Sequence, residues 1–209
     1  MPVQAPPAQD PSATSIPARR YHHGDLRAAL VEAGLALLVA SSGEAPGLRE
    51  VARAVGVSSA AVYRHFPNRE ALLRALALAG LEQLGAAQTA AMQAGGTTKD
   101  AFNASGRAYV RFALANPSLY RLIFATAGAT DRTDLPGNDN EPGRLLLGSV
   151  ARLYGDRLSA DGQRIVALRA WAIVHGLAML ALDGVLDAGM VAAELDRLVD
   201  SQGFAAGLA

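Results

Sequence analysis

The sequence predicts an all-α protein of about nine helices, in which a small N-terminal helical domain precedes a larger one. Apolar residues recur at spacings of three and four along most of the chain, which is the period of a helix with one buried face. The 209 residues are 51% hydrophobic and 18% charged, so the chain can build a sizeable core. Glycine and proline between the periodic stretches divide the chain into separate helices.

Each predicted helix is bounded by a capping residue or a helix breaker. We expect helices over about 24–40, 48–55, 59–66, 69–92, 98–116, 118–125, 141–158, 161–186 and 191–201. Residues 126–142 hold Gly, Pro, Asp and Asn without periodicity, which predicts a loop. Residues 1–18 are rich in Pro, Ala, Gln and Ser with one charge, which predicts a disordered N-terminal tail.

The segment GLREVARAVGVSSAAVYRHF at 47–66 predicts two short helices joined by a tight turn. Its first half carries one apolar stripe formed by Leu48, Val51, Ala52 and Val55. Gly56 follows the last of these residues, where a helix often ends in a left-handed conformation that glycine adopts without strain. Ser58 is a suitable N-cap for the second helix.

The second helix of this segment has the features of one that enters a DNA major groove. Small residues in its first turn would let it approach DNA closely, and they are Ser59, Ala60 and Ala61. Val62 and Phe66 should face inward, which leaves Tyr63, Arg64 and His65 to reach phosphates or base edges. Pro67 then stops the helix, and Asn68 caps the next one. An ordinary helical hairpin with solvated arginines is the alternative.

The charge distribution favours nucleic-acid binding by the N-terminal part alone. The chain has no net charge, but residues 17–75 hold eight arginines, no lysine and five carboxylates, whereas residues 76–209 carry a net charge of −2. This excess is modest, so we expect affinity to depend on specific phosphate contacts as well as on the bulk field. Arg19 and Arg20 precede the first helix and could form an arm in an adjacent minor groove; a solvated tail is the alternative.

Two regions resemble a known family. YHHGDLR at 21–27 and LREVARAVGVSSAAVYRHFPNREALL at 48–73 resemble the DNA-binding domain of TetR-type transcriptional regulators. YVRFALANPSLYRLIF at 109–124 and WAIVHGLAMLALDG at 171–184 resemble the ligand-binding domain of a TetR subgroup named for a Trp-His-Gly signature, here Trp171, His175 and Gly176.

The resemblance implies a DNA-binding domain over 19–75, with its helix-turn-helix at 47–66, and an effector-binding and dimerisation domain over 76–209. It also implies a homodimer that represses transcription at a palindromic operator and releases DNA when an unidentified small molecule binds. The DNA-contacting residues carried over by motif are Arg49, Ser58, Ser59, Ala60, Tyr63, Arg64, His65 and Arg69. A regulator without an effector, or an activator, is the alternative.

The predicted helix over 161–186 is apolar nearly all round, so it needs cover on both sides. One side can pack within its own domain. The other is a natural seam for a second subunit, with the last helix beside it, which predicts a homodimer through the last two helices. A central core helix of a monomer is the alternative.

Aromatic residues of the second domain are candidates for an apolar ligand pocket. They are Phe102, Tyr109, Phe112, Tyr120, Phe124, Trp171 and His175. Most aromatic residues at helical spacing simply pack in the core, and a lone histidine on an apolar helix is more often a hydrogen-bonded core residue than a ligand.

Other functional classes find little support in the sequence. The chain has no cysteine, no secretory signal and no run of about 18 apolar residues, from which we expect a cytoplasmic protein without a membrane segment. It lacks a phosphate-binding glycine loop, HExxH and GxSxG, so we expect no enzyme and no cofactor. His22 and His23 have no third ligand placed beside them, so no metal site is predicted.

Overall fold

The computed structural model describes residues 26–41, 44–127 and 141–201. This part of the chain forms ten α-helices, one 3-10 helix and no strand, which confirms the predicted all-α class. The elements are α1 (Leu26–Ala40), α2 (Leu48–Val55), α3 (Ser59–His65), α4 (Arg69–Met92), α5 (Thr98–Ala115), α6 (Pro117–Ala127), α7 (Glu141–Tyr154), η1 (Gly155–Arg157), α8 (Ala160–Leu182), α9 (Ala188–Ala193) and α10 (Leu195–Leu198).

The helices of the N-terminal half begin and end close to where the sequence predicts, whereas two later ones are shorter. The helix expected over 141–158 ends at Tyr154, and the chain continues through η1, which begins at Gly155 with φ 51°. The helix expected over 161–186 starts at Ala160, where the Ser159 hydroxyl accepts the Gly162 N–H at 3.2 Å. It ends at Leu182 because Gly184 turns the backbone into the left-handed region at φ 70°.

The prediction of one last helix over 191–201 is wrong, because the chain forms the short helices α9 and α10 there. Contacts with α5 hold this end of the chain. The Ser201 N–H donates to the side chain of Asn103 at 3.1 Å, and Arg107 pairs with Asp196 at 3.0 Å. Val199 packs against Gly106, where a Cβ would lie 2.7 Å from the valine side chain.

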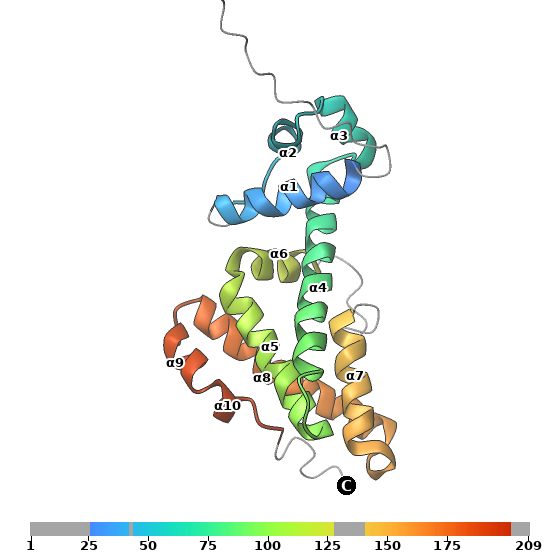
Figure 1. Ribbon diagram of the computed structural model, residues 1–209, viewed down its shortest axis with the longest axis vertical. Helices are drawn as coiled ribbons and strands as arrows, with labels where there is room; N and C mark the ends of the chain where they lie inside the picture. Colours follow the sequence, from blue (N-terminus) through green and yellow to red (C-terminus); the bar gives the residue numbers. More distant parts are fainter. Residues whose placement is uncertain (1–25, 42–43, 128–140, 202–209) are drawn as a thin grey trace, which may run out of the picture.

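The long helix α4 is the spine of the molecule, with α1–α3 at one end and the later helices around the other (Figure 1). A continuous apolar core follows it, from Leu30 and Val62 at the first end to Tyr120 and Val174 at the second. A second cluster, which includes Phe102, Val150 and Val166, lies between α5, α7 and α8. The predicted domain boundary at residue 76 falls inside α4, and it stays a prediction.

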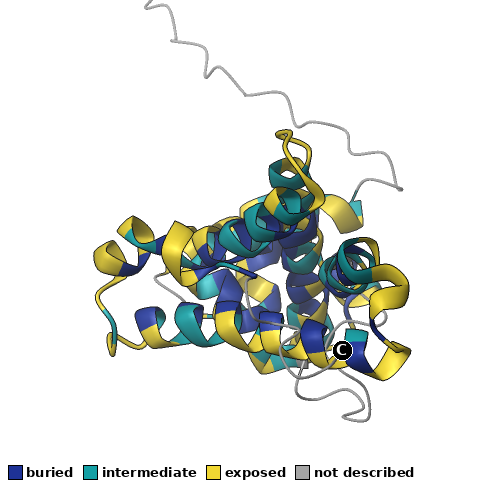
Figure 2. Ribbon diagram, turned by 90° about the horizontal axis from the view of Figure 1, so that it is seen from below, coloured by how far each residue is buried: buried dark blue, intermediate teal, exposed yellow. Residues whose placement is uncertain are grey.

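Buried residues line the faces that the helices turn toward one another, and exposed residues cover the outside (Figure 2). Two glycines, one on α1 and one on α4 itself, let neighbouring helices pack closely against α4. A Cβ at Gly34 of α1 would lie 2.8 Å from Leu76, and a Cβ at Gly80 of α4 would lie 2.7 Å from Leu119 of α6. The close packing of α1 against α4, and of α4 against α6, therefore depends on the absence of a side chain at these two positions.

Helix α8 packs against α5, α7 and α9 but leaves one face uncovered. Ile165, Leu168, Ile173 and Leu180 on this helix are exposed in the protomer. Over the described residues α8 is also the one helix long and apolar enough to cross a membrane. An 18-residue stretch of it has a mean hydropathy of 1.9, and 33% of that stretch is buried. By length and composition alone, α8 therefore meets a criterion for a membrane span that core helices of soluble proteins also meet.

Candidate nucleic-acid interface and small-molecule site

The turn between α2 and α3 has the geometry that the sequence predicts. Gly56 adopts the left-handed conformation at φ 77°, and its N–H donates to the Ala52 carbonyl at 3.0 Å. The Val57 N–H donates to the same carbonyl at 3.0 Å, so the free carbonyl at the end of α2 is satisfied. This turn fixes the direction in which α3 leaves α2.

Side-chain caps hold the start of α3 and the start of α4, which follows it. The Ser58 hydroxyl accepts the Ala61 N–H at 3.2 Å, and the Asn68 side chain accepts the Ala71 N–H at the start of α4 at 2.8 Å. Val62 and Phe66 are buried, as predicted. The predicted caps of both helices are therefore confirmed, and the inner face of α3 is anchored in the core.

The outer face of α3 presents polar groups to solvent. Tyr63 is 48% exposed, Ala60 and Arg64 are exposed, and Ser59 and His65 are half-buried. The first turn has no bulky side chain, because Ser58, Ser59 and Ala60 occupy it. Backbone N–H groups at such a helix start can approach a phosphate, and a phenol and a guanidinium can reach phosphates or base edges beside it.

Three arginines of this region lack a partner within the described residues. Arg49 and Arg53 lie four residues apart on the exposed face of α2, and Arg64 lies on the exposed face of α3. No hydrogen bond or ion pair within this part of the chain engages any of the three. Arg53 is not among the DNA-contacting residues predicted from the sequence; its spacing of four residues from Arg49 is the signal that could have identified it.

Arg69 is positioned by a contact that the sequence did not predict. Its guanidinium donates to the Ala45 carbonyl in the segment before α2. The residue therefore ties the start of α4 to the entry of α2, and its remaining N–H groups are still available to an anion. Arg27 of α1 lies over the Phe66 ring at 5.3 Å. Arg19 and Arg20, the predicted arm, lie outside the described residues.

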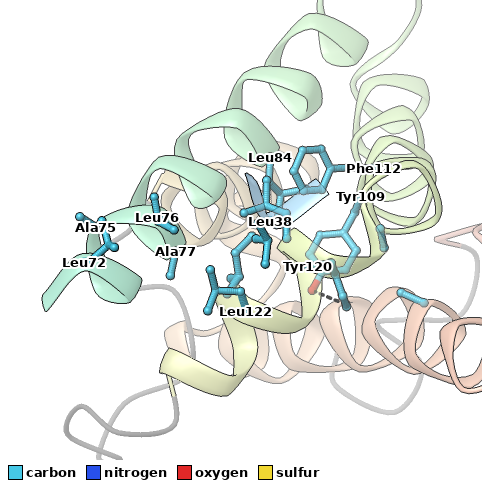
Figure 3. Packing of buried hydrophobic residues seen from close by; sticks show 14 of the residues in the cluster. Leu38, Leu72, Ala75, Leu76, Ala77, Leu84, Tyr109, Phe112, Tyr120 and Leu122 are labelled. Atoms are coloured by element: carbon cyan, nitrogen blue, oxygen red, sulfur yellow. Dashed lines mark hydrogen bonds between the residues drawn. The ribbon is translucent and has the colours of Figure 1, made fainter. Parts of the chain in front are cut away.

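A polar triangle lies inside the second half of the molecule. The hydroxyl oxygens of Tyr109 from α5 and Tyr120 from α6 are 3.1 Å apart, and they lie 3.0 Å and 2.8 Å from Nδ1 of His175 on α8. Figure 3 shows the two tyrosines facing each other, with their hydrogen bond dashed. The consecutive helices α5 and α6 thus meet the distant helix α8 at three polar atoms.

Aromatic rings surround the imidazole in this triangle. The indole of Trp171 stacks on His175 with centroids 4.8 Å apart and planes at 25°, and Phe124 contacts the same ring edge-on at 4.6 Å. Tyr109 and Tyr120 contact each other edge-to-face at 5.8 Å. Five of the seven aromatic residues predicted for a pocket therefore form one cluster.

Burial sets the ionisation of the triangle. It raises the pKa of Tyr109 to about 12 and raises the pKa of Tyr120 as well, because a phenolate would lose its hydration. Burial also lowers the pKa of His175 below its ordinary value of 6.5, with no charged group contributing. At neutral pH the cluster therefore holds two protonated phenols and an uncharged imidazole.

The remaining two predicted pocket residues lie elsewhere. Phe112 is buried in the main apolar core, near Leu84 in Figure 3. Phe102 belongs to the second apolar cluster and lines a pocket of about 410 Å³ between the end of α4, the start of α5 and α7, together with Met92, Leu145 and Arg152. The sequence of α5 alone does not show that Phe102, Tyr109 and Phe112 face different neighbours, so it could not tell which of them belong to the cluster around His175.

Sequence reasoning missed a buried polar pair one turn along α5 from Tyr109. The Gln88 side chain of α4 is 6% exposed, and its amide nitrogen donates to the Ser105 hydroxyl oxygen at 3.1 Å. The amide oxygen, Oε1, is buried without a hydrogen-bond partner within the described residues. A glutamine four residues after Leu84, on an apolar stripe, is the sequence signal that could have identified this position.

Comparisons with protein families match both halves of the chain. Residues 30–76 match a model described as bacterial regulatory proteins, tetR family, and residues 102–202 match one described as tetracyclin repressor-like, C-terminal domain. Together the two matches span well over half of the chain. No curated protein gives a significant match.

Solved structures share the fold over most of the chain. A protein of unknown function from Rhodococcus sp. RHA1 is 35% identical, with a TM-score of 0.65, over 91% of this chain and 99% of its own. A putative transcriptional regulator from Pseudomonas aeruginosa PAO1 is 19% identical, with a TM-score of 0.62, over 91% and 95% of the two chains. A putative TetR family transcription regulator from Shewanella sp. PV-4 is 19% identical, with a TM-score of 0.55, over 82% and 93%.

Proposed function

Because this chain belongs to the TetR family of transcriptional regulators, we propose that it represses transcription as a homodimer bound to a palindromic operator and that a small molecule releases it from DNA. The exposed face of α3 carries this proposal. It combines a capped start free of bulky side chains with an exposed tyrosine and an arginine that has no partner within the described residues. A merely structural hairpin needs none of these features.

The proposed contacts divide into two kinds. Arg49, Tyr63 and Arg69 bind phosphates and fix the position of the protein on DNA, together with Ser58, Ser59, Ala60 and His65. Arg64, in the last turn of α3, reads a base edge in the major groove. Arg19 and Arg20 bind an adjacent minor groove.

The homodimer forms through the uncovered face of α8, with α9 and α10 beside it. Four large apolar side chains on this face are exposed in the protomer, and a two-fold axis would bury them against their own copies. The two α3 helices of such a dimer would read half-sites about one helical turn of DNA apart, roughly 34 Å.

The second half of the chain, from residue 76, binds the effector, and the cluster around His175 belongs to its site. We propose that this half belongs to the Trp-His-Gly subgroup, which the sequence signature Trp171, His175 and Gly176 supports. We propose that the protein works in the cytoplasm by binding, with no catalytic step, cofactor, metal or membrane attachment.

Sequencing the genomic fragments that the purified protein retains at near-physiological salt tests this function. We expect one palindromic motif, and the genes beside it would nominate the effector. Salt-sensitive retention of arbitrary fragments would instead indicate an architectural protein, and retention of none would contradict the proposal.

Arg64→Ala tests the assignment of the base-reading residue. We expect it to relax the preference at one position of each half-site, at a cost of about 1–3 kcal/mol in binding free energy. Arg111→Ala is the matched control, because it removes an exposed arginine of α5 far from α3 along the chain. Equal losses for the two variants would contradict the assignment of Arg64.

A further inference from the structure

The triangle formed by Tyr109, Tyr120 and His175 has more short contacts than hydroxyl protons. Its three edges measure 3.1, 3.0 and 2.8 Å, and each tyrosine has one proton to donate. If Nδ1 of His175 carries a proton, one tyrosine proton has no acceptor inside the triangle. If Nδ1 is bare, both tyrosine protons are used. Since a buried hydroxyl without an acceptor is costly, Nδ1 accepts and the imidazole proton resides on Nε2.

This Nε2–H group has no partner within the described part of the chain. None of the hydrogen bonds there uses Nε2 of His175. The atom is also absent from the buried polar atoms that lack a partner, among which only Gln88 Oε1 is found, so solvent reaches Nε2. The two tyrosines therefore hold Nδ1 of His175 in place, and the Nε2–H group remains available to donate to a ligand.

The surroundings of this donor are apolar and uncharged. Trp171 and Phe124 flank the imidazole ring. The other side chains in contact with the imidazole are Tyr109 and Tyr120, and no charged group shifts its pKa. Arg121, which follows Tyr120 on α6, is paired with Asp183 at 2.7 Å. A charged ligand packed against these rings would give up part of its hydration and meet no counter-charge among the side chains that contact the imidazole.

We propose that His175 Nε2–H is the recognition donor of the effector site and that the effector is an uncharged, largely apolar molecule with a carbonyl-type acceptor. This inference rests on the proposed function only in calling the ligand an effector. Tyr109 and Tyr120 are positioning residues that select the imidazole tautomer, and Trp171 and Phe124 supply the apolar walls.

Two probes of nearly the same shape test the donor. Acetophenone carries a carbonyl oxygen where α-methylstyrene carries a methylene group. We expect the full-length protein, without DNA, to bind acetophenone about 5- to 10-fold more tightly than α-methylstyrene in calorimetric titrations. Equal affinity, or failure of acetophenone to bind, would overturn the proposal. Tighter binding of benzoate would overturn its uncharged ligand class.

His175→Phe should abolish this preference, because the variant keeps a ring between Trp171 and Phe124 but has no donor. Phe102→Leu is the control, since Phe102 lies in the separate cluster beside the 410 Å³ pocket. We expect it to preserve the preference. Loss of the preference in Phe102→Leu, or its survival in His175→Phe, would place the probe in that pocket and overturn the assignment.

Nitrogen-15 NMR of the imidazole gives a readout that does not depend on any variant folding. We expect the imidazole signals of the native protein that relaxation assigns to a buried ring to show a bare Nδ1 and a protonated Nε2, and we expect acetophenone to shift Nε2. A protonated Nδ1 would overturn the proposal. Because no DNA is present, a protein that fails to retain operator DNA can still pass this test, so the two failures remain distinguishable.

Discussion

The side-chain amide oxygen of Gln88 is buried between α4 and α5 and accepts no hydrogen bond from the described residues. The Ser105 carbonyl, 3.5 Å from Gln88 Nε2, can only accept, so it keeps the amide nitrogen on its side and the oxygen away from it. An unsatisfied buried acceptor costs about 1–3 kcal/mol, which exceeds the net gain of one ordinary hydrogen bond.

Gln88→Met should therefore raise the free energy of unfolding by about 1 kcal/mol, because it removes the unsatisfied oxygen and keeps a side chain of similar length. Urea denaturation measures the change. Gln83→Met on the exposed side of the same helix should leave stability nearly unchanged. A destabilised Gln88→Met would mean that the oxygen has a partner, such as a bound water.

His175 makes stability depend on pH. Its pKa is lowered by burial in the folded protein, so below about pH 6.5 the unfolded chain takes up a proton at this residue before the folded protein does. The folded protein is therefore expected to lose stability as the pH falls from 7.5 to 5.5, with a contribution from this group of at most about 1.4 kcal/mol per pH unit. Urea unfolding of the native protein and of His175→Phe should show a shallower dependence in the variant; equal slopes would exclude His175 as the source.

At the scale of elements, α6 occupies the position between the two ends of the molecule. It contacts α1, α4 and α5, and it carries Tyr120 of the triangle. A ligand that shifts His175 would therefore act on α6 first, and α6 could pass the shift to α1 and so to α2 and α3. The close crossing of α6 over Gly80 keeps this path rigid, because packed helices move as units.

Gly80→Val tests that crossing. Even a Cβ at this position would lie 2.7 Å from Leu119 and 2.9 Å from Ile123, both of which are buried, so the larger side chain should lower the free energy of unfolding by about 1–3 kcal/mol. Gly148→Val in α7 is the control, since the nearest atom to its Cβ would be the end of Arg152 at 3.8 Å. Thermal or urea unfolding distinguishes them. Since valine has a higher helix propensity than glycine, propensity predicts no loss in either variant, and similar losses would contradict packing at the α4–α6 crossing as the cause.

At the scale of the whole molecule, the exposed face of α8 is the proposed dimer interface. Leu168 is 44% exposed on this face. We expect Leu168→Glu to convert the dimer into a folded monomer, because two carboxylates would meet near the two-fold axis in an apolar seam. Analytical ultracentrifugation measures the mass, and circular dichroism checks the fold.

Leu78→Glu provides the matched control for this experiment. Leu78 is 55% exposed on α4, away from α8 in the sequence, so the variant should remain dimeric. A dimeric Leu168→Glu would contradict the proposed interface, and a monomeric native protein would contradict the dimer itself.

The sequence by itself determined the helices and the helix-turn-helix, because those features depend on neighbours along the chain. Gly56, Ser58 and Asn68 act on backbone groups within a few residues of themselves, and the apolar stripes fix which faces turn inward. The exposed face of α3 follows from the same local pattern, so its DNA-binding candidates could be named without coordinates.

Only the tertiary structure decided which aromatic residues meet. Tyr109 and Tyr120 lie 66 and 55 residues from His175. No periodicity within α5 distinguishes Tyr109 from Phe102 and Phe112. The unsatisfied oxygen of Gln88 and the break between α9 and α10 likewise depend on contacts across helices. Such contacts are set by how helices cross and which small residues let them approach, and a local sequence pattern does not specify these crossings.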